Sequence, residues 1–258
     1  MGFSIKQVIA LFAASVFLIP NIILGQNIHE AITFPNGFNL YAIGYLNYGV
    51  GWTFTPTANL KITSLGFYDT NSYQVDIWQS TNQPIATYLF PNIGSPQTTN
   101  YQSIAPLTLT AGQNYGITLN VFNQRPGTLY VRLFWEDSTH SNLFAVSPYL
   151  NGFESYFGTE ETQWSPSGES PFNQSNVIIG PTFKFEVIPP VLNVAFSNSN
   201  VMLAWPTNIS AFQLQSTPSI GFGADWQAVT NSPSVLNETN IVILPIDSTH
   251  RFFRLSGP

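Results

Sequence analysis

Short runs in which apolar and polar residues alternate with a period of two recur along most of the chain. In YQVDIWQS, Val75 and Ile77 fall on one side, and Asp76 and Trp78 fall on the other. The runs YGITLNVF and TLYVRLFW follow the same pattern, and the segments between such runs hold many Gly, Pro and Asn residues. Alternation of this kind predicts half-buried β-strands joined by turns. Since no run shows a convincing helical period, the pattern predicts an all-β protein.

Residues 140–176 depart from this pattern. They include NGFESYFGTEETQWSPSGESPFNQSN, which holds several Gly and Pro residues and a concentration of acidic residues. This composition predicts a long loop region. The sequence leaves open whether its acidic part, residues 154–169, binds calcium. The strand-like run TFKFEVI follows, and Pro189 with Pro190 then forms a stiff boundary.

The strand pattern restarts beyond the two prolines. VMLAWPTNISAFQLQST predicts two neighbouring strands, and DWQAV, TNIVILP and HRFFRLS complete a dense set of short strands. Trp205 and Trp226 have apolar neighbours in these runs, so we expect both in the core. The pattern therefore predicts a larger β-sandwich over residues 26–188 and a small immunoglobulin-like sandwich over residues 189–258.

The N-terminus, MGFSIKQVIALFAASVFLIPNIILGQ, has the layout of a secretory signal peptide. Lys6 precedes an apolar run that is broken by Pro20 and ended by Gly25. We expect residues 1–25 to be removed by cleavage between Gly25 and Gln26, which places the protein outside the cell or on its surface with no membrane span. The alternative is a retained anchor, for which residues 8–24 are near the lower length limit.

Composition and charge narrow the range of partners. Hydrophobic residues make up 44% of the chain, aromatic residues 15% and charged residues only 8%, a balance that suits sheets better than helices. The formal net charge of -6 and the scattered basic residues predict no nucleic-acid partner. Because the chain has no Cys, disulfides, thiolate nucleophiles and thiolate metal sites are excluded.

Two parts of the chain resemble known domains. Residues 191–258, with VMLAWPTNISAFQLQSTPSI, DWQAV and RFFRLSGP, resemble a small Ig-like C-terminal domain of exported bacterial proteins. Residues 40–187, with GVGWTFTPTANLKITSLGFYD, YQVDIWQSTNQPIATYLF and GPTFKFEV, resemble jelly-roll-like exported domains of the DUF4082 type. The first resemblance implies an accessory or surface-attachment role. The second implies a jelly-roll-like fold and an exported context, and neither implies an activity.

Catalytic signatures are missing from the sequence. His29, His140 and His250 are far apart and lack metal-ligand spacing, so we expect no metal and no cofactor. Serine-nucleophile and phosphate-loop motifs are absent as well. One enzymatic hypothesis is left, a pair of carboxylates that hydrolyses a glycosidic bond. The candidates for that pair are Asp69, Asp76, Glu136, Asp137, Glu154, Glu160, Glu161 and Glu169.

More residues support a second hypothesis, that the protein binds sugars. Trp164 lies in a polar loop near Tyr156 and Phe157, where an aromatic ring could stack on a sugar. Asp76 and Trp78 form a second candidate platform. The alternatives are that Trp164 caps the core and that Trp78 is packed beneath a loop. We expect a non-enzymatic exported protein that binds extracellular polysaccharide; the alternatives are a purely structural surface component and, third, a carbohydrate-active hydrolase.

Overall fold

The chain is described by a computed structural model over residues 9–12, 15–18, 27–33, 40–43, 49–67, 73–79, 83–90, 99–120, 129–135, 144–158, 176–179, 181–246 and 251–257. Every regular element in these ranges is a β-strand, and every strand pair is antiparallel, which confirms the predicted all-β sandwich class. None of these residues belongs to a helix long and apolar enough to cross a membrane.

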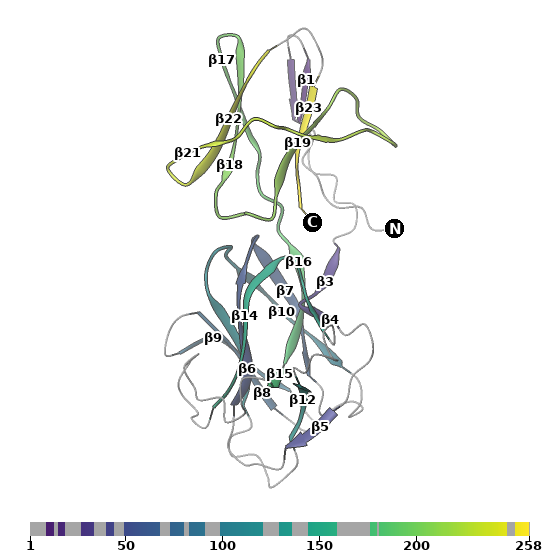
Figure 1. Cartoon of the computed structure of the whole chain (residues 1–258), viewed down its shortest axis with the longest axis vertical. Helices are drawn as coiled ribbons and strands as arrows, with labels where there is room; N and C mark the ends of the chain where they lie inside the picture. The colour runs from purple at the N-terminus through teal and green to yellow at the C-terminus, as the bar shows by residue number, and fades with distance from the viewer. Residues whose placement is uncertain are drawn as a thin grey trace.

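Two large sheets form the lower group of strands in Figure 1. The first has the order β14 (Leu150–Gly158), β6 (Gly49–Pro56), β11 (Tyr115–Asn120), β8 (Tyr73–Trp78) and β9 (Pro84–Phe90). The second has the order β10 (Asn100–Leu109), β7 (Leu60–Phe67), β16 (Thr182–Val187) and β3 (Ile28–Glu30). Two small sheets join β15 (Asn176–Ile179), β12 (Leu129–Trp135) and β5 (Leu40–Ile43), and β13 (Ala145–Val146) and β4 (Ile32–Thr33).

One hydrophobic cluster fills the space between the two large sheets. Strands β6, β8 and β11 supply Trp52, Val75 and Ile117, while Phe183 and Phe185 come from β16 of the other sheet. Because side chains alternate along a strand, the same strands turn Asp76 and Lys184 away from this cluster. The alternation predicted for β8 and β11 is therefore the pattern that builds the core.

Trp52 ties the first sheet to the start of β16. Its side chain is fully buried, and its ring stacks on that of Phe183, with centroids 5.6 Å apart and planes 6° apart. Its Nε1 donates a hydrogen bond of 2.6 Å to the carbonyl oxygen of Pro181. A buried indole N–H needs such a partner, so the bond fixes where β16 enters the sheet.

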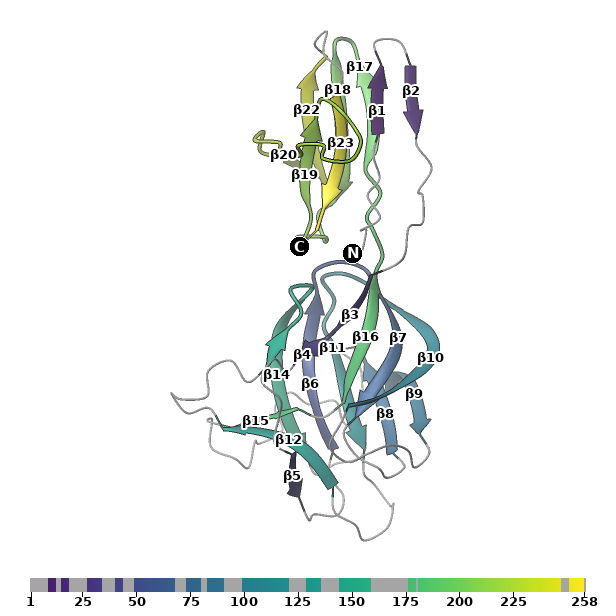
Figure 2. The same cartoon turned by 90° about the vertical axis from the view of Figure 1, so that its right-hand side faces the viewer.

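A second group of strands, the upper group in Figures 1 and 2, contains two more sheets. One has the order β17 (Asn193–Ser197), β18 (Asn200–Pro206), β22 (Thr239–Pro245) and β21 (Ser234–Leu236). The other joins β23 (Arg251–Ser256), β19 (Gln213–Thr217) and β20 (Gln227–Ala228). The two sheets share a second hydrophobic cluster that contains Leu203, Trp205, Leu214 and Phe253.

Of the two tryptophans expected in this core, only Trp205 lies there. Trp226 is not in the cluster, and the prediction for it is wrong. Its ring packs against the guanidinium of Arg254, whose Cζ lies 4.1 Å from the ring centroid. Arg254 also donates a 2.8 Å hydrogen bond from Nε to Gln215. The run DWQAV is too short to predict which way the Trp226 side chain points, because β20 begins only after Trp226.

The N-terminal apolar run forms two strands beside the second group, β1 (Ile9–Phe12) and β2 (Ser15–Leu18). They pair with each other, and β1 pairs with β23, so they extend that sheet at its edge (Figure 2). The predicted cleavage after Gly25 stays a prediction. If it occurs, it removes both strands and leaves β23 without this neighbour.

The two groups of strands touch directly. Ala111 follows β10, yet it belongs to the second hydrophobic cluster, and the ring of Phe212 packs against both clusters. At the same junction a Cβ atom added to Gly257 would lie only 3.0 Å from the hydroxyl of Tyr149 and 3.2 Å from the Phe212 ring. The junction is therefore packed side chain against side chain, in addition to the link through Pro189 and Pro190.

The long loop predicted over residues 140–176 is wrong in its first half. Strand β13 and the nine-residue strand β14 lie within it, and β14 pairs along β6. The pairing shifts register between Asn151 and Glu154, where Gly152 has a φ of 65°. A glycine accepts this conformation readily, so the Gly that indicated a loop instead accommodates a bulge.

Candidate functional site

The structure brings Asp76 and Trp78 together on the side of β8 that faces away from the core cluster, and it buries both. Their exposed fractions are 1% and 4%. The Trp78 Nε1 donates a 2.9 Å hydrogen bond to Thr118 Oγ1 on β11. With so little exposed surface, Trp78 offers no face to a sugar ring, and the packed alternative describes it.

Asp76 is surrounded by hydrogen-bond donors. Its carboxylate accepts bonds from Gln74 Nε2, at 2.9 Å and 3.1 Å, and from Thr87 Oγ1 at 2.6 Å. A buried carboxylate is stable only when such donors replace water. This arrangement stabilises the link between β8 and β9 and explains why an acidic residue is tolerated there.

The other predicted stacking residues are placed only in part. Tyr156 and Phe157 lie in β14, opposite Gly51 and Val50 of β6. Trp164 lies outside the described residues. A stacking site made by these three aromatic residues therefore stays a prediction.

Two of the candidate catalytic acids can be compared. Asp76 and Glu154 lie on β8 and β14, which are separated by β11 and β6 in the same sheet. Three strand spacings of about 4.8 Å put them roughly 14 Å apart, more than the roughly 5 to 9.5 Å between the two carboxyl groups of glycosidases. These two residues do not form such a pair. Asp69, Glu136, Asp137, Glu160, Glu161 and Glu169 lie outside the described residues.

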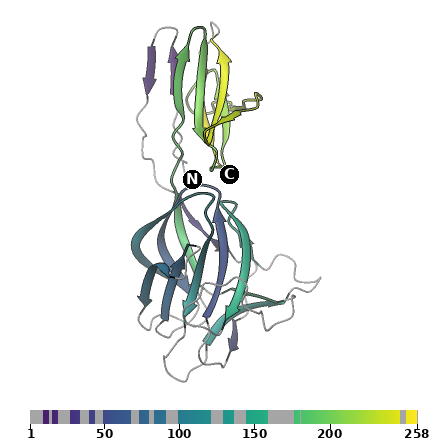
Figure 3. The same cartoon turned by 90° about the vertical axis from the view of Figure 1, so that its left-hand side faces the viewer.

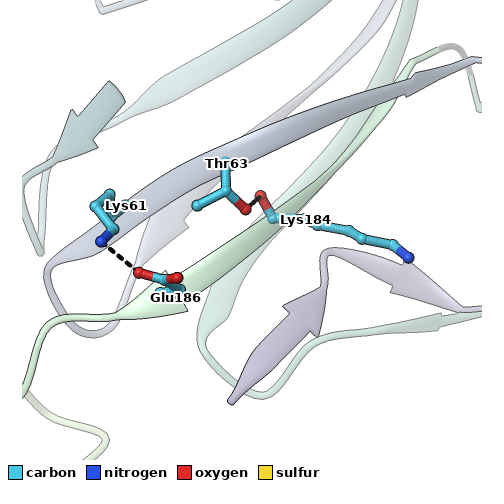
Figure 4. Close-up of polar contacts among 4 residues, drawn as sticks. All are labelled: Lys61, Thr63, Lys184 and Glu186. Carbon is cyan, nitrogen blue, oxygen red and sulfur yellow. Dashed lines mark hydrogen bonds and ion pairs between the residues drawn. The ribbon is translucent and has the colours of Figure 1, made fainter. Parts of the chain in front are cut away.

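The outward side of β10, β7, β16 and β3 carries a different polar cluster, which the sequence reasoning missed. We call it the charged face, and it consists of Glu30, Lys61, Tyr101, Lys184 and Glu186. Figure 4 shows Lys61 beside Glu186, with which it forms an ion pair, and Lys184 extending away from that pair. Lys184 pairs instead with Glu30, with 3.2 Å between Nζ and Oε1.

The charged face has no net charge because it holds two lysines and two glutamates, and each lysine is paired with a glutamate. The pairs lie in register across the strands, with Lys61 opposite Glu186 and Lys184 opposite Glu30. Their side chains are partly accessible to water, with exposed fractions from 13% to 40%. Such a surface can offer both hydrogen-bond donors and acceptors to a ligand without attracting either sign of charge.

Tyr101 is the aromatic member of the charged face. It lies opposite Gly66 of β7, and a Cβ atom at Gly66 would be only 2.7 Å from Tyr101 Cε1 and 2.8 Å from Cδ1. The ring therefore covers the backbone of a glycine that leaves room for it. The Lys184 ammonium lies 4.1 Å from the ring centroid, a cation–π contact.

Signals for this face were present in the sequence. LKITSLGF and TFKFEV alternate apolar residues with Lys61, Lys184 and Glu186, which share the solvent side of two strands. A glycine inside a strand, such as Gly66, often marks a close approach by another group. The sequence does not show that β7 and β16 are neighbours, because 114 residues, 68 to 181, lie between the end of β7 and the start of β16.

Among the described residues, no group of three or more His, Asp or Glu side chains comes together. His29 points away from the charged face, stacks on Phe185 with centroids 5.4 Å apart, and meets Tyr149 edge to face at 5.0 Å. Burial lowers the pKa of His29 and raises that of Tyr149, so both rings favour their neutral forms.

No protein-family model matches the chain, and no curated protein is similar to it. The charged face must therefore be interpreted from its own residues.

Proposed function

We propose that this protein is a non-enzymatic exported protein that binds extracellular polysaccharide, and that the charged face is its binding surface. The observation that carries the proposal is Tyr101, whose ring covers Gly66 on an outward sheet face, beside the Lys184 ammonium and its partner Glu30. Sugar recognition needs this combination of a flat apolar ring with donors and acceptors for hydroxyl groups beside it.

The charge balance of the face points to neutral polysaccharides. A sugar ring that stacks on Tyr101 displaces the Lys184 ammonium from the aromatic face. Lys184 and Glu30 then lie beside the sugar, one as a donor and the other as an acceptor. An anionic polymer gains little here, since each lysine already has a carboxylate partner.

In this proposal residues 1–25 direct export and are removed at Gly25–Gln26. Residues 26–188 form a jelly-roll-like sandwich that presents the charged face, and residues 189–258 form an Ig-like sandwich with an accessory or attachment role. Mass spectrometry of the exported protein tests the first part, and we expect a mature chain that starts at Gln26.

The test of binding is affinity electrophoresis through gels that contain neutral or anionic polysaccharides. We expect a neutral polysaccharide to retard the protein. Tyr101→Ala should weaken this binding at least about fivefold, the effect of losing a stacking contact of about 1 kcal/mol. Tyr101→Phe is the matched control, because it keeps the ring, and it should bind nearly as the natural protein does.

Trp164→Ala separates the two candidate surfaces. If Trp164→Ala abolishes binding while Tyr101→Ala leaves it intact, the loop with Trp164, Tyr156 and Phe157 is the site and the charged face is not. If no neutral polysaccharide retards the folded protein, the binding proposal fails.

A purely structural surface component is the second candidate function. It is favoured by exposed aliphatic side chains on β21 and β22, among them Leu236 and Ile243. Exposed apolar surface of this kind marks contacts between proteins rather than contacts with sugars.

A further inference from the structure

Strand β23 has two neighbours in its sheet, and one of them comes from the N-terminal segment. Strand β19 lies on one side of β23, and β1 lies on the other. The register of β1 sets Ile9 opposite Phe253 and Ala10 opposite Phe252. Figure 3 shows β1 and β2 in purple at one side of the upper group.

Removal of residues 1–25 turns β23 into the edge of this sheet. The backbone N–H and C=O groups that face β1 then have no partner strand. Strand β23 is six residues long, and its register with β19 has no shift. The opposite edge strand, β20, has only two residues. The shortened chain therefore has one long, regular open edge in this sheet.

Proteins ordinarily block such an edge, because it pairs readily with other strands. Two edge strands of the first group carry a block of this kind. Strand β9 begins with Pro84, and β10 shifts its register against β7 between Ser103 and Leu107. Strand β23 contains neither a proline nor a bulge. Its backbone is therefore suited to pair with a strand that takes the place of β1.

The side chains of β23 favour an apolar strand in that place. Phe253 is 1% exposed and belongs to the second hydrophobic cluster. Residues directly opposite each other in an antiparallel pair share one side of the sheet. A strand that replaces β1 therefore sets the residue opposite Phe253 on the side of this cluster. An aliphatic residue at that position extends the cluster, whereas a charged residue is buried there without a partner.

We propose that, after removal of residues 1–25, the β23 edge binds an extended, uncharged aliphatic strand of another polypeptide. Strand β1 shows the chemistry that fits, because its sequence IALF has no charge and pairs with β23 in the full chain. A strand added to a sheet edge gains affinity from backbone hydrogen bonds and specificity from alternate side chains. The inference rests on the proposed cleavage and is independent of sugar binding.

A second copy of β23 is a poorer occupant of this edge. Strand β23 carries Arg251 and Arg254. Pairing β23 with the β23 of another copy brings the arginines of both strands together, and like charges on paired strands are destabilising. An uncharged strand avoids this repulsion. In the full chain β1 occupies the edge, so the segment that directs export also keeps the edge closed until cleavage.

The test uses a dye-labelled peptide of residues 6–13, KQVIALFA, with the full chain and with a chain that begins at Gln26. Among the described residues, both hydrophobic clusters begin at or after Ala31, so the shorter form keeps both cores. We expect fluorescence anisotropy to show binding to the shorter form with a Kd of roughly 100 μM. Binding to the full chain should be at least about tenfold weaker, because β1 holds the edge.

The matched control is the same peptide with Ala10→Pro and Leu11→Pro. Alternate N–H groups of a strand face each of its neighbours, so proline at two successive positions removes a donor to β23 in either phase. This peptide should bind at least about tenfold more weakly than the natural one. Hydrogen exchange of the shorter form should slow in β23 with the natural peptide and stay unchanged with the control.

A second protein variant keeps the test decisive. If the shorter form does not fold, the full chain with Ala10→Pro and Leu11→Pro replaces it, because these substitutions release the edge without shortening the chain. A folded protein with a released edge that does not bind the peptide at about 1 mM, roughly ten times the expected Kd, would overturn the proposal. Equal binding of both peptides, or equal binding by both forms of the protein, would do so too.

A failure of the cleavage can be told apart from a failure of strand binding. The mass of the exported protein shows whether residues 1–25 are removed, and a chain that retains them contradicts the proposed cleavage. The peptide assay measures the edge itself, in a protein made without those residues. Absence of peptide binding therefore contradicts this inference and leaves both the cleavage and the sugar-binding proposal intact.

Discussion

A single glycine decides how the candidate site is built at the residue scale. Gly66 lies on the outward side of β7, and the Tyr101 ring occupies the space that a side chain there would take. The same contact holds the ring beside Lys184, which in turn pairs with Glu30. One missing side chain on the core strand thus positions an aromatic ring and a cation on the outward face.

His29 predicts how stability depends on pH. Burial lowers its pKa below the ordinary value of 6.5, so the unfolded chain binds a proton at a higher pH than the folded chain does. The free energy of unfolding should therefore fall as the pH drops from about 7.5 through 6.5 towards the folded pKa. Tyr149, the other titratable ring in contact with His29, has a raised pKa and stays neutral over this range.

Urea unfolding at several pH values checks this expectation. His29→Gln should flatten the decline in that range, since glutamine does not titrate. A decline that is just as steep in the variant would show that other groups control the acid sensitivity.

At the scale of elements, the alternating runs predicted strands well where one face meets the core. In β8, Val75 and Ile77 face the core as the pattern predicted. In β18, Leu203 and Trp205 do the same. The alternation says less where a distant part of the chain decides the outcome. Asp76 and Trp78 point away from the core cluster, and both are buried, as the packed alternative has it for Trp78. Alternation reports which side a residue faces, and it does not report what covers that side.

The candidate site was less predictable than the strands for the same reason. Lys61 and Glu186 could be assigned to solvent sides from their own strands, but their pairing depends on β7 lying beside β16. Strand pairing between segments so far apart in sequence is set by the whole fold rather than by local pattern. The same holds for Tyr101, which meets Lys184 only because β10, β7 and β16 are neighbours.

The Lys61–Glu186 ion pair joins β7 to β16, so we expect the free energy of unfolding to depend on the charges of these two residues. Lys61→Glu places like charges opposite each other and should lower the free energy of unfolding by about 1 kcal/mol. The double variant Lys61→Glu with Glu186→Lys restores opposite charges and should recover most of that loss. Chemical denaturation of the three proteins measures both steps. Equal losses in the single and double variants would mean that the pair contributes nothing to the pairing of β7 with β16.

At the scale of the whole molecule, the two groups of strands carry opposite kinds of outward surface. One sheet of the first group presents Tyr101 and two ion pairs on its outward side, and one sheet of the second group exposes aliphatic side chains such as Ile243. Their junction contains side chains that belong to both hydrophobic clusters, among which Phe212 contacts each. The junction is therefore expected to hold the two surfaces in a fixed relation.

The contacts of Phe212 with both hydrophobic clusters lead to a prediction about how the two groups of strands unfold. We expect the natural protein to melt in one transition, because the shared contacts couple the groups. Phe212→Ala removes the ring that touches both clusters and should split or broaden that transition. Phe196→Ala is the control, since Phe196 is 47% exposed and lies on β17, away from the junction. Calorimetry would contradict this account if the natural protein already showed two separate transitions.

Hydrogen exchange in the presence of a bound polysaccharide tests the central claim most directly. An oligosaccharide of the neutral polymer that retards the protein is added, and the exchange of backbone amides is followed along the chain. We predict slower exchange in β7, β10 and β16, the strands that carry Tyr101 and its charged neighbours, with little change in β17, β18 and β22. Protection confined to the segment around Trp164, with none in β7, β10 and β16, would contradict the assignment of sugar binding to the charged face.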